Sequence, residues 1–265
     1  MLPTLPAPPR NPVIRWPLDE SIAATRQRDQ QPWGARPIVL PIAFLAGIVV
    51  VGSLVTHYLR PDGDHARLVF AVVVNVVAEG LLGFGIWLGG REIAARNGGW
   101  AAFGWRRPQP RDLWIAGLGI VFAFLVRVFV AVWAGLLTHG RAVREAQNLQ
   151  VDHVRAATVI LLIVVVVICA PVFEELMFRG LILRTLMRRW GFWPAAIVST
   201  TIFAGFHTYE VSTLLGAIVL ALSVAGIGAT NCLLVRYTDR LAPGVLVHAA
   251  LNGLAVAVLV TGATG

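Results

Sequence analysis

The sequence contains no lysine, few acidic residues and only two cysteines, and these shortages limit what the protein can be. Charged residues make up 14% of the 265 positions, whereas 57% are hydrophobic, which lies outside the range of ordinary soluble domains. Such a composition indicates a membrane protein with several spanning segments. All 22 basic residues are arginine. This usage suggests a GC-rich genome more than a nucleic-acid-binding surface, so we expect membrane lipid and no nucleic acid as a partner.

The two cysteines exclude a disulfide framework and a zinc-binding cysteine pair. Cys169 and Cys232 each fall inside a hydrophobic stretch, far apart in the sequence, and they form no motif with the spacing of metal ligands. We therefore expect both to be small, buried, hydrophobic side chains.

Long apolar segments dominate what remains. A helix needs about 20 mainly apolar residues to cross the hydrocarbon core of a bilayer. Segments near this length predict an all-α, polytopic transmembrane helical bundle with about seven spanning helices, in a range of six to eight. The fifth segment is the shortest. The expected spans are 38–59, 66–90, 112–138, 157–178, 193–208, 212–235 and 243–261.

The chain divides into three parts: a tail at 1–36, a first membrane region at 37–150 and a second at 151–265. Residues 1–36 are polar and rich in proline and arginine, without the apolar region of a signal peptide. We expect this tail to be disordered or loosely bound to the membrane surface.

The arginines predict the orientation in the membrane. If seven helices alternate in direction, the tail and the segments 91–111, 179–189 and 236–240 fall on one side and hold most of the arginines. Cytoplasmic segments carry the excess of basic residues. We therefore expect a multi-pass protein of the cell membrane with a cytoplasmic N-terminus.

The first membrane region carries few polar residues. Asn75 and Glu79 share a helix face at i,i+4 spacing, and Arg127 lies inside the third span. Because charges within a membrane usually pair, we expect an ion pair between Glu79 and Arg127. Its role would be structural, although a transporter that uses these two residues is an alternative.

The second region has an acidic motif, E-E-L-M-F-R (174–179), at the end of an apolar run. Glu175 and Arg179 have the i,i+4 spacing and order that favour an ion pair. Glu174 points about 100° away around the helix and lacks that partner. Pro171 is expected to kink the helix just before the acids and open space for water. The alternative is a helix end anchored at the interface.

Two further motifs follow on separate helices. F-A-G-F-H (203–207) places Phe203 and His207 on one face, and H-A-A-L-N (248–252) does the same for His248 and Asn252. Each histidine pattern could also be a hydrogen-bonded packing contact between helices. Together with Glu174, however, these residues supply a desolvated general base, imidazoles that share its proton and an amide that donates to developing negative charge.

The three motifs, in this order and spacing, resemble the CPBP intramembrane proteases. This family, of metalloprotease or glutamate-protease type, includes the type II CAAX prenyl endopeptidases and the Abi-type bacteriocin self-immunity proteins. Its pattern is E-E-x-x-x-R, then F-x-x-x-H, then H-x-x-x-N or H-x-x-x-D, and all three elements are matched here. The resemblance covers about 155–261 and would make 151–265 the catalytic core.

The resemblance implies a role for each matched residue. Glu174 and His207 would activate the attacking water, and His248 with Asn252 would stabilise the oxyanion. Glu175, Arg179 and Phe203 would support them. The implied activity is an intramembrane peptidase of the glutamate type, without a cofactor, that cleaves a peptide or protein substrate in a membrane cavity. In eukaryotic members the substrate carries a prenylated cysteine, but no motif here indicates a lipid-modified substrate.

Alternatives of other classes stay open. A zinc ion held by Glu174, His207 and His248 would suit the residue types, although an H-E-x-x-H motif is absent. The sequence also lacks a G-x-G-D motif and a convincing serine nucleophile beside a histidine. A non-catalytic membrane scaffold or bacteriocin-immunity protein could keep the motifs for binding alone.

Overall fold

The computed structural model describes residues 16–29, 33–59, 61–145, 156–208, 211 and 213–261, and in these residues all regular structure is helical. The predicted all-α class is confirmed. The expected division between 150 and 151 lies outside the described residues. The same holds for four of the arginines that predicted the orientation, two in the tail and two elsewhere: Arg10, Arg15, Arg60 and Arg155. The helices of the first half are α1 (Pro17–Arg28), α2 (Arg36–Tyr58), α3 (Asp64–Arg96), η1 (Gly99–Phe103), α4 (Pro110–Thr138) and α5 (Arg141–Glu145).

The second half begins with one long helix that contains two π-helical segments. Its consecutive parts are α6 (Ala156–Leu162), η2 (Ile163–Cys169), α7 (Ala170–Glu175), η3 (Leu176–Ile182) and α8 (Leu183–Trp190). Three helices follow, namely α9 (Phe192–His207), α10 (Leu214–Thr238) and α11 (Ala242–Thr261). The acidic motif therefore lies inside a helix, and the segment expected to leave the membrane near 179 continues as helix to Trp190.

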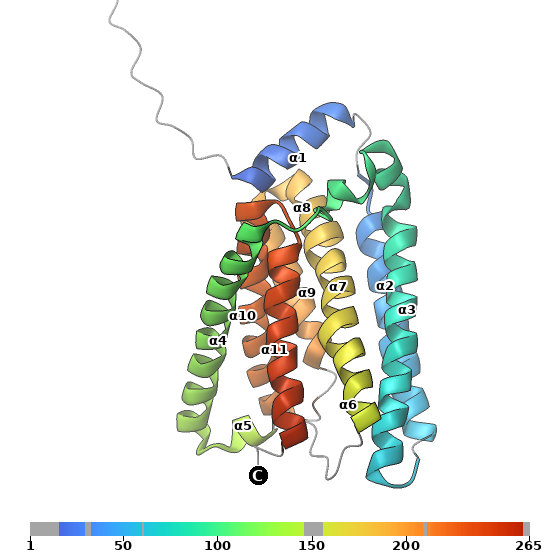
Figure 1. Ribbon diagram of the computed structural model, residues 1–265, viewed down its shortest axis with the longest axis vertical. Helices are drawn as coiled ribbons and strands as arrows, with labels where there is room; N and C mark the ends of the chain where they lie inside the picture. The colour runs from blue at the N-terminus through green and yellow to red at the C-terminus, as the bar shows by residue number, and fades with distance from the viewer. Residues whose placement is uncertain are drawn as a thin grey trace, which may run out of the picture.

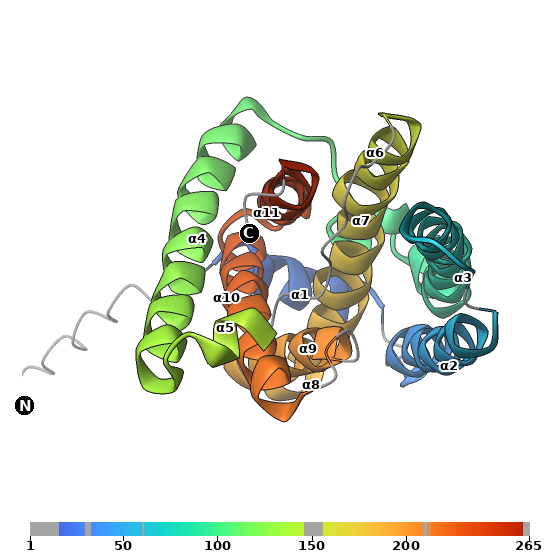
Figure 2. The same cartoon turned by 90° about the horizontal axis from the view of Figure 1, so that it is seen from below.

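The helices form an upright bundle (Figure 1). Seen from below, α2 and α3 stand together on one side and α4 stands on the opposite side (Figure 2). The long helix with α7, and the helices α9, α10 and α11, fill the space between them. The motifs of the second half are thus placed on neighbouring helices in the middle of the bundle.

Within the described ranges, five helices are long and apolar enough to cross a membrane, which confirms a polytopic bundle. They are Arg36–Val55, Val69–Arg96, Pro110–Thr138, Val159–Trp190 and Leu214–Thr238. The apolar part of α11, Ala242–Val258, is shorter. Helix α9 has sixteen residues and is therefore about 24 Å long, less than the roughly 30 Å of a hydrocarbon core.

Part of the expected loose tail is a packed helix, which corrects that expectation. Helix α1 lies across one end of the bundle (Figure 1), with Leu18 and Ile22 buried in the core. Asp19 accepts a hydrogen bond from Arg236 at 3.0 Å, and Thr25 accepts one from Arg188 at 2.9 Å. The polar composition hid the helix because only two apolar positions, four residues apart, face the protein.

The proline before the acidic motif explains the first π-helical segment. Pro171 has no N–H to donate. In η2 the backbone instead bonds five residues back, as in the N–H of Ala170 to the carbonyl of Val165. Wide turns of this kind occur often at functional sites. Both thiols are free, and Cys232 is buried as expected, whereas Cys169 is partly exposed.

Candidate active site

Three side chains from three helices meet inside the bundle. Oε2 of Glu174, on α7, lies 3.8 Å from Nε2 of His207, on α9, and 3.8 Å from Nε2 of His248, on α11. Glu174 and His248 are buried, and His207 is partly exposed. Oε2 of Glu174 is buried and has no hydrogen-bond partner among the described residues. The sequence motifs therefore converge on one carboxylate oxygen.

The adjacent acid has a different environment, as the helical geometry predicted. Oε1 of Glu175 accepts hydrogen bonds from Arg179 at 2.9 Å and from Asn231 at 2.8 Å, and it lies 3.3 Å from Nδ1 of His248. The side chains of Glu175 and Arg179 are completely buried. Charge-assisted hydrogen bonds of this kind hold a carboxylate in a fixed position. Glu175 therefore supports His248, while Glu174 faces the space between the histidines.

The hydrogen bonds fix which nitrogen of each histidine points into the site. Nδ1 of His207 lies 2.8 Å from the carbonyl oxygen of Phe203, and a carbonyl can only accept, so Nδ1 carries the hydrogen. Nδ1 of His248 faces Glu175 in the same way. In the neutral rings both Nε2 atoms, which are directed at Glu174, are then hydrogen-bond acceptors.

Phe203 packs against most of the groups that form the site. Its ring centroid lies 4.8 Å from that of His207 and 5.5 Å from that of His248. The guanidinium carbon of Arg179 lies 4.3 Å from the centre of the same ring, a cation–π distance. Phe203 is completely buried, so its ring packs against both imidazoles while its backbone carbonyl accepts the hydrogen bond from His207. This packing gives the phenylalanine of the second motif a physical role.

The structure gives Asn252 a contact that the sequence did not predict. Its Nδ2 donates a hydrogen bond of 2.9 Å to the carbonyl oxygen of Val166 in η2. In a π-helical turn that carbonyl would bond to residue 171, which is a proline without an N–H. Asn252 supplies the missing donor. A side-chain amide has two N–H groups, so one of them is not used by this contact.

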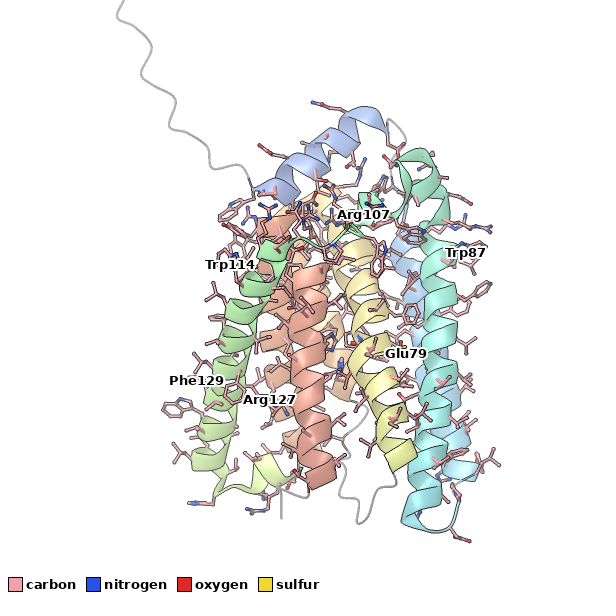
Figure 3. All side chains as sticks on the ribbon, viewed as in Figure 1. Glu79, Trp87, Arg107, Trp114, Arg127 and Phe129 are labelled. Atoms are coloured by element: carbon pink, nitrogen blue, oxygen red, sulfur yellow. The ribbon has the colours of Figure 1, made fainter. Side chains whose placement is uncertain are left out.

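Two residues of the first half are not paired as expected. Glu79 lies on α3 and Arg127 on α4 (Figure 3), and these helices stand on opposite sides of the bundle (Figure 2). The side chain of Arg127 is exposed on the bundle surface, whereas Oε2 of Glu79 is buried and has no hydrogen-bond partner among the described residues. The expected ion pair was wrong because the seven-segment pattern does not say which helices are neighbours.

One residue of the network was missed altogether. Asn231, on α10, is completely buried, and its Nδ2 donates both to Glu175 and to the carbonyl oxygen of Gly244 at 3.1 Å. Gly244 must be small, because a Cβ there would lie 3.1 Å from Oε2 of Glu175. An isolated asparagine in an apolar span is itself a signal, because a polar group inside a membrane is costly unless it is paired.

Glu174, His207 and His248 are residue types that can also bind zinc. Ligands about 2.0–2.2 Å from zinc in a tetrahedral site are roughly 3.3–3.6 Å apart, slightly less than the 3.8 Å that separates Glu174 from each histidine. Among the described residues, no group of three or more His, Cys, Asp or Glu side chains is arranged to hold a metal.

Comparison with known proteins gives one match. No curated protein and no solved structure matches the chain. Residues 156–254 match the family model described as type II CAAX prenyl endopeptidase Rce1-like, and this segment contains the acidic motif, both histidines and Asn252. Residues 156–254 of this multi-pass membrane protein therefore form an Rce1-like domain, similar to the type II CAAX prenyl endopeptidases.

Proposed function

We propose that the protein is an intramembrane endopeptidase of the glutamate type, in which Glu174 and His207 activate a water molecule. The observation that carries this proposal is the position of Oε2 of Glu174, 3.8 Å from Nε2 of both histidines. Two polar atoms at that separation can both hydrogen-bond to one water at ordinary distances of about 2.8 Å. A water held in this way donates to Glu174 and to the acceptor nitrogen of His207.

The chemistry follows from these positions. Glu174 takes a proton from the water as its oxygen forms a bond to the carbonyl carbon of the peptide. The carbonyl oxygen becomes an oxyanion. When the C–N bond breaks, the proton held by Glu174 passes to the leaving nitrogen. The reaction needs only water as a co-reactant and forms no covalent bond between enzyme and substrate.

His248 and Asn252 are the proposed donors to the oxyanion. The second N–H of Asn252 Nδ2 is not used by the bond to Val166. His248 directs Nδ1 at Glu175, so it donates from Nε2 only when both ring nitrogens carry a hydrogen. Donors of this kind stabilise the charge that develops during acyl transfer.

The substrate in this proposal is a peptide or protein segment that enters the bundle from the membrane or the cytoplasmic side. The end of the bundle covered by α1 also holds Arg106, Arg188 and Arg236. The positive-inside rule assigns this end to the cytoplasm. We therefore propose a protein of the cell membrane whose N-terminal helix is cytoplasmic, and lipid-modified peptides are the first substrates to test.

The test uses the purified protein in detergent and a fluorogenic peptide that ends in a farnesylated cysteine and three further residues. Glu174→Ala and His207→Ala should each reduce cleavage by a factor on the order of 10²–10⁴, the contribution of a general base. Glu92→Ala, at an exposed glutamate of α3, is the matched control and should cleave normally. Cleavage of normal rate by Glu174→Ala would leave a scaffold or immunity role as the better explanation.

The zinc alternative is tested on the same preparation. The proposal expects cleavage to continue after treatment with a chelator and expects purified protein to hold no stoichiometric zinc. A bound ion at one equivalent, together with loss of cleavage when it is removed, would replace the water-activating glutamate with a zinc-dependent mechanism at the same three residues.

A further inference from the structure

A groove at the end of the bundle that α1 covers is not used by the proposed reaction. It consists of two adjoining cavities of about 480 and 430 Å³, bounded by the start of α1 and by α4, α9 and α10. Cavities of this size lie in the range of small-molecule sites. We call the two cavities together the α4–α10 groove. The residues that line both of them are Trp16, Trp114, Ile115 and Tyr237.

The wall of the α4–α10 groove is apolar, and one side of it faces lipid. Leu118 of α4 and Leu233 of α10 line the larger cavity, and both side chains are exposed on the bundle surface. Because α4 and α10 are long and apolar enough to cross a membrane, we expect this surface to contact acyl chains. The aromatic residues of the wall are of the kinds that gather where a membrane meets water, namely tryptophan and tyrosine.

The length of α4 places the groove at the level of the lipid headgroups. The helix has 29 residues and is therefore about 44 Å long, whereas a hydrocarbon core is about 30 Å thick. A core centred on the helix leaves about 7 Å at each end, which is slightly more than one turn. Arg111 and Trp114 lie in the first turns of α4, and Figure 3 shows Trp114 near the end of the bundle that α1 covers.

Two arginines line the groove, and only one of them has a protein partner. Arg236 donates a hydrogen bond of 3.0 Å to Asp19. Arg111 lines the smaller cavity with an exposed side chain, and no hydrogen bond or ion pair joins that side chain to another described residue. The neighbouring acid, Asp112, is buried and accepts a hydrogen bond from the backbone of Gln109 instead. Arg111 is therefore a cation at headgroup level that lacks an anion.

The α4–α10 groove is separate from the site around Glu174. Trp193 of the groove and His207 of the site lie near opposite ends of α9, about 21 Å apart along the helix axis. A ligand in the groove is therefore too far away to contact the groups proposed to activate water. Its effect would be on the assembly of the helices that form the groove.

We propose that the α4–α10 groove binds one phospholipid with an anionic headgroup. Its phosphate accepts hydrogen bonds from Arg111, which arginine forms readily with phosphate oxygens, and one acyl chain lies along the apolar wall toward Leu118. Only an amphipathic anion satisfies both features, because a hydrocarbon leaves Arg111 unpaired and free phosphate leaves the wall uncovered. Since Trp16 stands at the start of α1, the bound lipid also joins α1 to α4 and α10.

The experiment measures lipid binding to the purified full-length protein by native mass spectrometry, with phosphatidylglycerol and phosphatidylcholine as the probes. Arg111→Gln removes the charge, and Leu118→Trp places a larger side chain in the larger cavity. The matched control is Arg91→Gln, at an exposed arginine of α3, because α3 stands on the opposite side of the bundle from α4 (Figure 2).

The unmodified protein and Arg91→Gln should each bind one phosphatidylglycerol, with a higher affinity than for phosphatidylcholine. Arg111→Gln should bind phosphatidylglycerol about fivefold more weakly, the loss expected for one arginine at the headgroup level, without a change for phosphatidylcholine. Leu118→Trp should weaken the binding of both lipids, because it blocks the acyl chain.

Three results would overturn the proposal. They are equal affinity of the unmodified protein for the two lipids, unchanged affinity of Arg111→Gln for phosphatidylglycerol, and a loss in Arg91→Gln as large as in Arg111→Gln. Displacement of the lipid by excess inorganic phosphate would assign the groove to a free anion and overturn it as well. If Leu118→Trp fails to fold, Arg111→Gln, which replaces an exposed side chain, still decides the outcome.

Hydrogen exchange of the backbone amides of α1 gives a second readout that does not depend on cleavage. Phosphatidylglycerol should slow this exchange in the unmodified protein and in Arg91→Gln, and the same concentration should slow it less in Arg111→Gln. Exchange in α1 that does not respond to phosphatidylglycerol would refute the link between the lipid and α1. The inference goes beyond the proposed function, because Glu174→Ala should bind the lipid as the unmodified protein does.

Discussion

The two halves of the bundle use similar apolar sequence for different purposes. In the spanning window of α2 only 11% of the residues are buried, whereas in that of α10 56% are buried. Both helices are apolar enough by composition to cross a membrane. The difference lies in the few polar side chains, because α10 contributes Asn231 to a buried network and α2 contributes no group to it. Within a membrane, paired polar groups rather than hydrophobicity indicate which helices form the interior.

The largest expected loss of stability comes from breaking a buried ion pair, and an exposed ion pair provides the comparison. Glu175→Ala leaves the completely buried Arg179 without its counter-charge and should lower the free energy of unfolding by about 3–5 kcal/mol. Glu92→Ala removes the partner of Arg36 at an exposed position and should cost about 0–1 kcal/mol. Denaturation in mixed micelles measures both. Equal losses would mean that the two halves are stabilised alike.

Replacement of two asparagines by alanine should give a smaller difference in stability. Asn231→Ala removes a buried donor to Glu175 and to the carbonyl of Gly244 and should cost about 1–3 kcal/mol, because both acceptors lose a partner. Asn75→Ala, on α3, removes an exposed side chain that donates to its own helix at Ala71. Its effect should stay within about 0.5 kcal/mol. Thermal unfolding in detergent, with both variants side by side, measures the contrast.

The smallest effect concerns the attachment of α1 to the first half. Partial burial raises the pKa of Asp29, but hydrogen bonds from Asn97, Arg96 and Trp33 and the charge of Arg96 lower it by more, so it lies below the ordinary 3.8. A lowered pKa in the folded state contributes stability above pH 3.8 that is lost as the pH falls through the folded value.

Trp33 provides the measurement, because its Nε1 donates to Asp29 at 3.1 Å. Acidification below pH 3.8 should change the tryptophan fluorescence of the unmodified protein. The variant Asp29→Asn should lack this change and show a weaker α1 contact at every pH. A transition of the same size in Asp29→Asn would assign it to another group.

The predictions that the structure confirms within one helix follow from the spacing of residues along that helix. The Glu175–Arg179 pair follows from i,i+4 spacing on one helix, and the structure confirms it. The meeting of Glu174, His207 and His248 does not follow from any one helix, and only the resemblance of the three motifs to a known family predicted it. Their catalytic roles remain predictions, whereas the position of each side chain is now described.

Long-range neighbours explain the parts that failed. We expected an ion pair between Glu79 and Arg127 because both lie in spans of the first half. In the structure, however, α3 packs on the long helix of the second half and α4 stands on the far side of the bundle (Figure 2). Helix α1 was missed because its contacts, such as Asp19 with Arg236, join residues more than 200 positions apart. Neither contact leaves a periodic signal in the sequence.

The wide turns of the long helix make its length, and not only its residues, a determinant of the site. Each residue of an α-helix turns the chain by about 100°. Deletion of one residue within Ile163–Cys169 would therefore rotate α6 relative to the acidic motif by about that angle. Asn252 could then no longer reach the carbonyl of Val166 while Glu174 still faced the two histidines. Every chemically active side chain would nevertheless still be present.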